Sequence, residues 1–182
     1  MVGGGPDSGI GETHRIAMRI DNKCELVAGV FSRRLEKSSV LAKQLGIPPE
    51  RLYGDYKSMA SEEAKRTDKI DAVCIVTPTD SHYEIARQFL QVGIHVICDK
   101  PLCVSLSEAR ELMELADRAG LVVCLTHNYT GYAMVRHAAR MVTTFFPCDL
   151  QTVTNGIFAH GLMRAERNHD VECGRSGANF CK

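Results

Sequence analysis

The sequence predicts an α/β fold, in which a parallel sheet is wrapped by helices. Two observations carry the prediction: short apolar segments alternate along the chain with helical ones, and a glycine-rich stretch begins at the third residue. Such alternation is typical of parallel sheets, whose strands are joined by right-handed crossover helices. In these sheets ligands bind beyond the carboxyl ends of the strands, so the residues that follow each strand are the candidates for function.

Four short apolar segments are the expected parallel strands, and the second of them is apolar on both faces, as a buried strand requires. They are residues 25–31, 71–77, 94–98 and 121–125. A central strand of roughly five residues should precede the glycine-rich stretch. Only Met1 and Val2 stand before it, so we expect residues 1–3 to form at most a stub.

Helices are predicted between the strands from their apolar spacing and their end signals. They should cover residues 35–45, 58–66, 80–92, 106–119 and 133–142. Ser105 and Glu108 form a capping box at the start of the fourth helix, in which each side chain binds a free backbone N–H group. Beyond Thr143 the periodicity is lost, although residues 149–158 are compatible with one strand.

The composition excludes several kinds of partner. Lysine plus arginine and aspartate plus glutamate both number 22, so a net charge of zero gives no reason to expect a nucleic acid or an anionic membrane. No apolar run reaches the ~20 residues that span a bilayer. No basic-then-apolar signal segment opens the chain. We therefore expect a cytoplasmic protein that acts on a small-molecule substrate.

The eight cysteines are expected to be reduced thiols rather than disulfides or metal ligands. Four of them fall at or within the apolar segments, where cysteine behaves as a small buried hydrophobe. A zinc site can be imagined in the last third of the chain from Cys148, Cys173, Cys181, His160 and His169. No C-x-x-C pair is present, so we expect no metal.

The glycine-rich stretch is the first candidate site. A glycine loop that leads into a helix is how a Rossmann domain holds a pyrophosphate, because the backbone can approach the phosphates and the helix N-terminus offers free N–H groups. Gly3 and Gly5 fit the G-x-G-x-x-G spacing, but the third glycine comes late, at Gly9 or Gly11. Taken alone, the stretch is equally compatible with a flexible terminus; the alternating segments that follow it favour the loop.

The segment after residues 25–31 bears on the choice of cofactor. An acidic residue there would bind the adenosine ribose hydroxyls and favour NAD, but the chain has Ser32, Arg33 and Arg34. A hydroxyl with two arginines suits a 2′-phosphate, so NADP is favoured over NAD. The alternative is that both arginines are simply solvated on a surface loop.

Two later strand ends carry polar groups. Thr77-Pro78 is followed by His82, which either faces the ligand crevice or is simply packed against its helix. The next strand ends in Asp99 and Lys100. The lysine can reach a substrate hydroxyl near the nicotinamide, and the carboxylate can orient its ammonium group. A surface salt bridge between these two residues is the alternative.

In their order and spacing these motifs resemble the glucose–fructose oxidoreductase / inositol dehydrogenase (Gfo/Idh/MocA) family of NAD(P)-dependent dehydrogenases. The resemblance covers roughly residues 1–142, and Asp99-Lys100-Pro101 is a conservative variant of the family's Glu-Lys-Pro. It implies a Rossmann-type doubly wound parallel sheet with a short remnant of a second α+β domain.

The resemblance also implies domain limits and site residues. The NAD(P)-binding domain would be 1–128, with a truncated first strand, and 129–182 would be the incomplete start of the substrate domain. Lys100, in contact with the substrate and the nicotinamide ribose, and His82 are the implied catalytic candidates. The implied cofactor-binding residues are Gly3, Gly5, Gly9, Ser32, Arg33, Thr77, Pro78, Asp99, Pro101 and Asn128.

The sequence departs from the family pattern in its last third. The family's second domain carries an Asp-x-x-x-His pair whose histidine transfers the proton, and no such pair is found after Asn128. We therefore expect a sugar or polyol dehydrogenase impaired by truncation, the alternative being an inactive nucleotide-binding or oligomerising fragment. Residues 143–182 should be poorly packed on their own or be ordered mainly by a second copy of the chain, because Phe145 and Phe146 would otherwise be exposed together.

Overall fold

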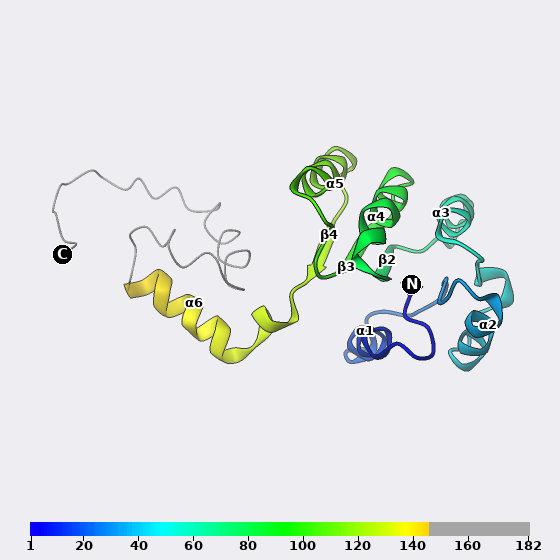
Figure 1. Cartoon of the computed structure of the whole chain (residues 1–182), viewed down its shortest axis with the longest axis horizontal. Coiled ribbons are helices and arrows are strands. Elements are labelled where there is room, and N and C mark those ends of the chain that lie inside the picture. The colour runs from blue at the N-terminus through cyan, green and yellow to red at the C-terminus, as the bar shows by residue number, and fades with distance from the viewer. Residues whose placement is uncertain (146–182) are drawn as a thin grey trace. The chain divides into compact units, whose positions relative to one another are not determined.

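The structure, a computed structural model, describes residues 1–145. It divides the chain into two compact units, Met1–Thr126 and His127–Lys182. The first unit contains one parallel sheet of four strands in the order β1-β2-β3-β4, as Figure 1 shows. The strands are β1 (Val2–Gly3), β2 (Ala72–Val76), β3 (His95–Asp99) and β4 (Val123–Thr126). This arrangement confirms the predicted α/β class.

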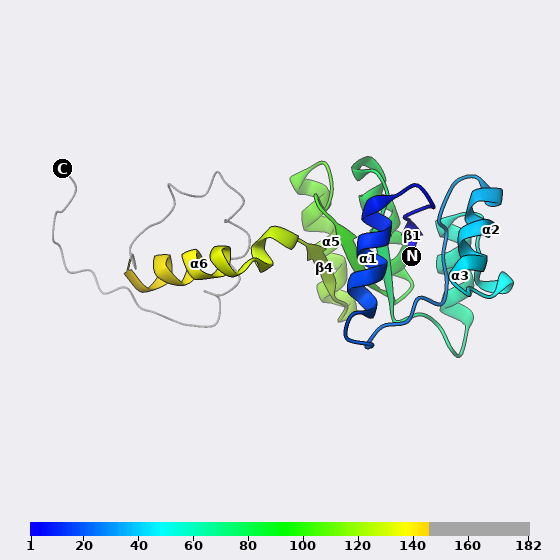
Figure 2. The same ribbon diagram turned by 90° about the horizontal axis from the view of Figure 1, so that it is seen from below.

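Helices cover both faces of this sheet. They are α1 (Gly9–Arg19), α2 (Leu35–Gln44), α3 (Tyr56–Lys65), α4 (His82–Gln91) and α5 (Leu106–Ala119). The helices α3, α4 and α5 lie on one face, and α1 and α2 lie on the other, nearer the viewer in Figure 2. Short 3₁₀ turns, η1 (Pro49–Arg51) and η2 (Thr79–Ser81), precede α3 and α4.

The apolar alternation of β2 divides the core between these two layers. Val73 and Ile75 belong to the cluster that packs under α3, α4 and α5. Cys74 and Val76 belong to the cluster on the α1 and α2 side. Both faces of the strand are therefore buried, which is why its sequence is apolar throughout.

Local end signals set the helix limits. At α5 the capping box forms as predicted, with Glu108 N bonded to the Ser105 side chain at 3.2 Å, and Gly120 ends the helix with a positive φ of 64°. The helix expected at 58–66 begins two residues earlier. Asp55 caps it, because its side chain accepts from the N–H groups of the first turn.

The strand predicted at residues 25–31 is not formed, and this prediction was wrong. Apart from two isolated parallel bridges, Val2↔Val30 and Gly29↔Leu52, the segment has no strand pairing. The reason lies in its neighbour: β1 is the expected stub, with only two residues to offer as partners. A strand requires backbone hydrogen bonds to a neighbouring strand. Because β1 has only two residues, it cannot pair with the whole of residues 25–31.

The second unit begins with the 3₁₀ turn η3 (Asn128–Gly131) and continues as α6 (Ala133–Phe145), three residues longer than predicted. Tyr129 and Tyr132 make an edge-to-face contact with ring centres 5.5 Å apart. The strand expected at 149–158 and the imagined zinc ligands lie outside the described residues.

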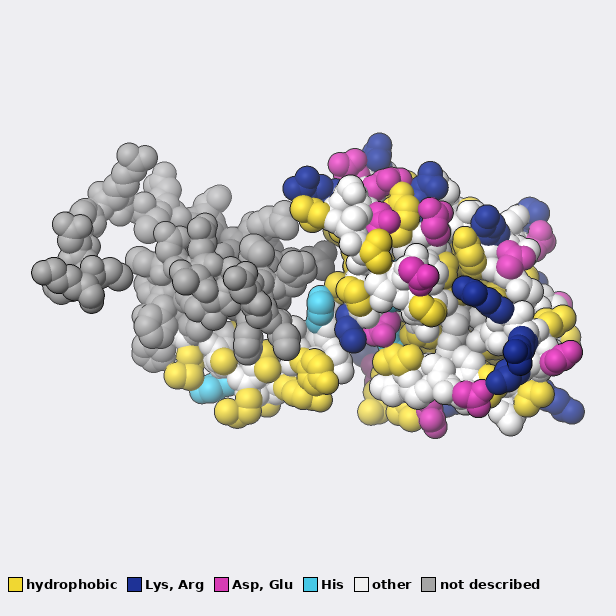
Figure 3. Space-filling view, viewed as in Figure 1, with side chains coloured by type: hydrophobic (Ala, Val, Ile, Leu, Met, Phe, Trp, Pro, Cys, Tyr) yellow, Lys and Arg dark blue, Asp and Glu magenta, His cyan; other side chains and the backbone are white. Residues whose placement is uncertain are grey.

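The surface of the first unit carries charges of both signs close together, without a large patch of one sign on the face shown in Figure 3. Among residues 1–145, no helix is both long and apolar enough to cross a bilayer. In the same part of the chain, no group of three or more His, Cys, Asp or Glu side chains has the arrangement of a metal site.

Candidate functional site

The glycine loop lies between β1 and α1, at the carboxyl end of the sheet. Ser8 caps α1, because its Oγ accepts from the N–H group of Gly11 at 3.1 Å. A Cβ on Gly11 would lie 2.3 Å from the Cα of Gly4, so these two glycines let the loop and the helix approach closely. A Cβ on Gly5 would lie 2.9 Å from the carbonyl oxygen of Phe31, which brings the loop against the segment before Ser32.

The predicted glycines therefore divide into two kinds. Gly3 and Gly5 are needed for close packing within the protein, whereas a Cβ on Gly9 would meet no protein atom within 4 Å. Gly11, the alternative third glycine, is the one that packs against the loop. Sequence reasoning gave Gly4 no role, although the run of three glycines was a signal for it.

Arg15 holds this loop in place, and sequence reasoning missed it. Its side chain is almost fully buried, and Nη1 donates to the carbonyl oxygen of Gly4 at 2.7 Å. A charge-assisted hydrogen bond from the second turn of α1 thus fixes the middle of the loop. The spacing of eleven residues gave no indication of this contact.

The loop has the features of an anion cradle. The N-terminus of α1 points its free N–H groups toward the loop, and its dipole favours a negative charge there. A Cβ built on Gly9, the first residue of α1, would meet no protein atom within 4 Å. These residues fit the pyrophosphate of a dinucleotide.

The segment after Phe31 is an exposed basic rim. Ser32 Oγ accepts from the N–H group of Arg34 at 3.1 Å, and the side chains of Arg33 and Arg34 are exposed. Among the ion pairs of the described residues, none involves either arginine. Their positions suit a 2′-phosphate, and equally the alternative of plain solvation.

His82 is buried, with 1% of its surface exposed, and both ring nitrogens lie 2.8 Å from backbone carbonyl oxygens. Nε2 faces Thr77 and Nδ1 faces Pro101. The ring therefore ties the turn after β2 to the turn after β3, and it has no nitrogen directed at open space. This geometry favours a positioning role over proton transfer to a substrate.

Lys100 follows β3 directly and is exposed at the carboxyl end of the sheet. The expected contact between Asp99 and this ammonium group is wrong, because the carboxylate has other partners. Thr126 Oγ1 donates to Asp99 Oδ1 at 3.0 Å, and His14 Nε2 lies 3.6 Å from the same oxygen. Asp99 thus joins β3 to β4 and α1, and the lysine is left accessible.

A cysteine–histidine–aspartate series also lies behind the strand ends. Cys74 Sγ is 3.3 Å from His14 Nδ1, and the other nitrogen of that ring faces Asp99. Burial raises the pKa of the Cys74 thiol to about 11. The sulfur is therefore protonated and enclosed, and the series is a packing contact rather than a nucleophilic site. Cys98 is similar, with a thiol pKa that burial raises to about 12.

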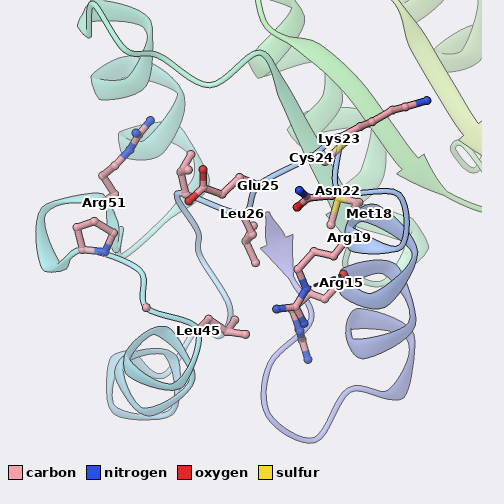
Figure 4. A pocket seen from close by; sticks show the side chains of 13 residues that line it. Arg15, Met18, Arg19, Asn22, Lys23, Cys24, Glu25, Leu26, Leu45 and Arg51 are labelled. Carbon is pink, nitrogen blue, oxygen red and sulfur yellow. Dashed lines mark hydrogen bonds between the residues drawn. The ribbon is translucent and has the colours of Figure 1, made fainter.

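One cavity in the described part of the chain lies away from this site. It has a volume of about 670 Å³ and lies between the carboxyl-terminal ends of α1 and α2, with Met18, Leu26 and Leu45 in its wall (Figure 4). These helices run antiparallel to the strands, so the cavity is at the opposite end from the glycine loop. Its wall includes residues 22–27, of which 25–27 belong to the segment that fails to form a strand.

The candidate residue Asn128 begins η3 and belongs to the second unit.

Comparisons with known proteins agree with this geometry. A family model described as "Oxidoreductase family, NAD-binding Rossmann fold" matches residues 1–129. An uncharacterized oxidoreductase of Bacillus subtilis is 36% identical over 172 residues, which cover 94% of this chain and 44% of that protein. A D-xylose 1-dehydrogenase (NADP⁺) of Haloferax volcanii is 28% identical over 72% of this chain and 38% of its own length.

Solved structures give the same result. The crystal structure of an inositol dehydrogenase homolog from Azotobacter vinelandii, complexed with NADH and myo-inositol, matches with a TM-score of 0.76 and 41% identity, over 79% of this chain and 38% of that one. An oxidoreductase from Sinorhizobium meliloti matches with a TM-score of 0.72 and 51% identity, over 79% and 40% of the two chains. The chain therefore spans about two fifths of the length of these relatives.

Proposed function

Because the chain belongs to the oxidoreductase family with an NAD-binding Rossmann fold, whose model matches residues 1–129, we propose that its first unit binds NAD or NADP at the glycine loop. The observation that carries this proposal is the uncrowded position of Gly9 at the N-terminus of α1. Gly3 and Gly5 keep the loop close to the sheet so that its backbone can reach the pyrophosphate.

The remaining cofactor contacts follow from the strand ends. Ser32 and Arg33 would meet the adenosine ribose, with NADP favoured by the arginine. Thr77 and Pro78 would border the cofactor at the end of β2. Asp99 and Pro101 would shape the turn beside it, and Asn128 would lie toward the substrate.

The proposed reaction is hydride transfer between the nicotinamide and a CH–OH carbon of a sugar or polyol. The bound cofactor supplies the hydride chemistry. Lys100 is the catalytic candidate, because its exposed ammonium group follows β3 and can donate a hydrogen bond to a substrate hydroxyl. The names of two relatives, which mention D-xylose and myo-inositol, support this substrate class.

A second candidate is a chain that binds the nucleotide without turnover. The observation that favours it is the environment of His82, whose two nitrogens are both occupied by carbonyl oxygens, so this histidine is a poor candidate for the base. Losing general-base help lowers rates by ~10²–10⁴. Turnover of a polyol and sugar panel with NAD and NADP, lost in Lys100→Met, would reject this second candidate.

The proposal also includes a domain organisation and a cellular location. Residues 1–128 would be the cofactor domain, and 129–182 the start of a substrate domain. A cytoplasmic setting suits the free thiols of Cys74 and Cys98. Assembly with a second copy through residues 143–182 stays a prediction, since all but the first three of these residues lie outside the described part of the chain.

The decisive experiment is cofactor binding to a variant that leaves the fold alone. Gly9→Val adds a side chain where no protein atom lies within 4 Å, so we expect an unchanged melting temperature and at least ~10-fold weaker binding of NAD⁺ and NADP⁺ by calorimetry. Gly54→Val is the matched control, because Gly54 is equally uncrowded. Unchanged binding in Gly9→Val, or no binding by the wild type, would reject the proposed site.

A further inference from the structure

The strand β4 is the last strand of the sheet, and within the described residues its outer edge has no neighbouring strand (Figure 1). The ladder with β3 uses the backbone groups of alternate residues, since Val96 N donates to the carbonyl oxygen of Val122 at 2.9 Å. The N–H and C=O groups of Val123 and Leu125 therefore point away from β3. They are free to pair with a further strand.

This edge lacks the features by which proteins usually prevent strand pairing. Sheet edges are commonly protected by charged side chains, especially lysine, or by proline. Residues 121–126 contain neither. Val122 is 60% exposed, and Cys124 is exposed as well. The outer edge of β4 is therefore uncharged and partly apolar, which favours pairing with another strand.

The helix α5 extends this surface. One flank of α5 packs beside α4, where Arg87 Nε lies 3.2 Å from Glu111 Oε1. Since α5 is the last helix on this face of the sheet, its other flank lies above the outer edge of β4 (Figure 1). Leu106 and Met113, seven residues apart, share that flank and are 66% and 37% exposed. The edge strand and the helix flank thus form one apolar surface.

Charges lie on both sides of this apolar centre in a self-complementary order. Arg110 precedes Met113 by three residues and Asp117 follows it by four, so all three share one side of α5. Both charged side chains are exposed, and neither takes part in an ion pair among residues 1–145. A second α5, laid antiparallel on this flank, would place each arginine opposite the aspartate of the other helix. Such a surface fits a second copy of itself.

We infer that β4 and α5 form an interface between two copies of this chain, related by a two-fold axis. The two β4 strands pair antiparallel, so that the two sheets become one continuous sheet. Val123 exchanges both backbone hydrogen bonds with Leu125 of the second copy, and Cys124 lies opposite its own counterpart at the axis. The inference goes beyond the proposed function: it does not depend on cofactor binding, and it uses a surface other than residues 143–182.

The spacings of strands and helices are compatible with both contacts at once. Leu112 of α5 packs in the same cluster as Val96 and Val123, so α5 lies over β3 and β4. Two α5 helices in the continuous sheet would be separated by two strand spacings, about 9–10 Å. Packed helices are about 8–10 Å apart. The pairing of the strands therefore brings the apolar flanks of the helices into contact.

The first test is the oligomeric state of the full chain, measured by analytical ultracentrifugation over a series of protein concentrations. We expect a dimer that Arg110→Asp and Asp117→Arg each weaken at least ~10-fold, because each change sets like charges against one another. The double variant Arg110→Asp/Asp117→Arg should restore the dimer, since it exchanges the two charges. Lys43→Asp is the matched control, because Lys43 is an exposed lysine of α2 on the other face of the sheet.

The second test concerns the register of the strands. Opposite residues of a non-hydrogen-bonded antiparallel pair have Cα atoms about 4.5 Å apart, within the range that a disulfide spans. Diamide takes up the two thiol hydrogens as the disulfide forms, and it should join two chains through Cys124. Mass spectrometry should find the Cys124–Cys124 peptide in the wild type and in the control Cys24→Ser, whose cysteine is also exposed. A linked dimer without this peptide would overturn the pairing of the strands.

Three further results would overturn the inference. One is a wild-type chain that stays monomeric at every concentration. Another is a dimer that survives both Arg110→Asp and Asp117→Arg; its loss in Phe145→Ser/Phe146→Ser would place the contact in residues 143–182 instead. The third is a charge-exchanged double variant that remains monomeric. A wild-type dimer that binds neither NAD⁺ nor NADP⁺ would reject the proposed function and leave the interface standing.

Discussion

The two halves of the sheet along the strand order differ in backbone pairing, although their sequences are equally apolar. On one side, β2, β3 and β4 share ladders of four residue pairs each. On the other, β1 pairs with β2 over two residues, and the segment before Ser32 makes only isolated bridges. Residues 25–31 and 71–77 would both serve as strands, but only the second has a neighbour long enough to pair with it. A strand is thus specified by its partner as much as by its own composition.

The weaker side is held by other interactions. Met1 donates from its amino group to the carbonyl oxygen of Ala28 at 2.8 Å, and Val30 N donates to the carbonyl oxygen of Met1 at 2.9 Å. Gly29 N donates to the carbonyl oxygen of Arg51, whose guanidinium binds the fully buried carboxylate of Glu63. Isolated backbone hydrogen bonds, the terminal amino group and one buried ion pair replace the ladder there.

The largest expected effect is at this buried ion pair. Glu63→Ala would leave the guanidinium of Arg51 buried without its carboxylate, and we expect a loss of about 3–5 kcal/mol in the free energy of unfolding, measured in urea. Glu62→Ala is the control, since its pair with Lys65 is exposed and should be worth less than about 1 kcal/mol. Similar losses in both variants would mean that side chains do not hold the weaker side.

The Glu63 pair also predicts a pH dependence. Burial alone would raise the pKa of this carboxyl, but hydrogen bonds from Arg51 and Tyr53 outweigh it, and the pKa is lowered. Its contribution is therefore present above the pKa of the unfolded chain and is lost as the pH falls through the lowered value. Acid titration of the unfolding free energy should show this loss in the wild type and not in Glu63→Ala.

A second, smaller pH effect is expected from the amino group of Met1. Burial lowers the pKa of this group to about 6 from an ordinary value of 8.0. The unfolded chain then binds more protons between these two values, so stability should rise by about 2 kcal/mol as the pH rises from 6 to 8. Acetylation of this amine removes its charge, and a rise of equal size in acetylated protein would contradict the assignment.

The smallest expected effect compares packing on the two sides. Phe89 lies on the buried face of α4 in the well-paired half, and Phe31 ends the segment that lacks a ladder. Both are buried, so both changes to alanine destabilise. We expect Phe31→Ala to cost about 1–2 kcal/mol less, because the loosely paired segment can relax into the space while the ladders cannot. Equal costs in urea unfolding would show that the two halves are equally rigid.

The elements that could be predicted from the sequence are those that depend on residues close together in the chain. The strands at β2, β3 and β4 and the capped start of α5 depend on local pattern, and they were predicted correctly. The strand predicted at 25–31 did not form because its neighbour β1 is too short. The local sequence of residues 25–31 contains no information about the length of that neighbour. The apolar pattern shows that a segment can form a strand, and the presence of a neighbouring strand decides whether it does.

The candidate site shows the same limit. Residues that follow strands were identified because chain order places them at one edge of the sheet. Their partners were not, since Asp99 meets His14 and Thr126 across long separations in sequence. The packing role of Gly11 and the contact of Arg15 with Gly4 likewise depend on how α1 lies against the loop.

The rate at which the buried thiol of Cys74 is alkylated reports how often α1 separates from the sheet. With a pKa of about 11, only about one molecule in ten thousand carries the thiolate at neutral pH, and the sulfur is enclosed between β2 and α1. Alkylation at this position must therefore wait for α1 to leave the sheet, whereas Cys24 and Cys124 are exposed and open to reaction from the start. The delay between the two classes of adduct measures how often the α1 side of the sheet opens, in the unmodified protein and without any introduced label.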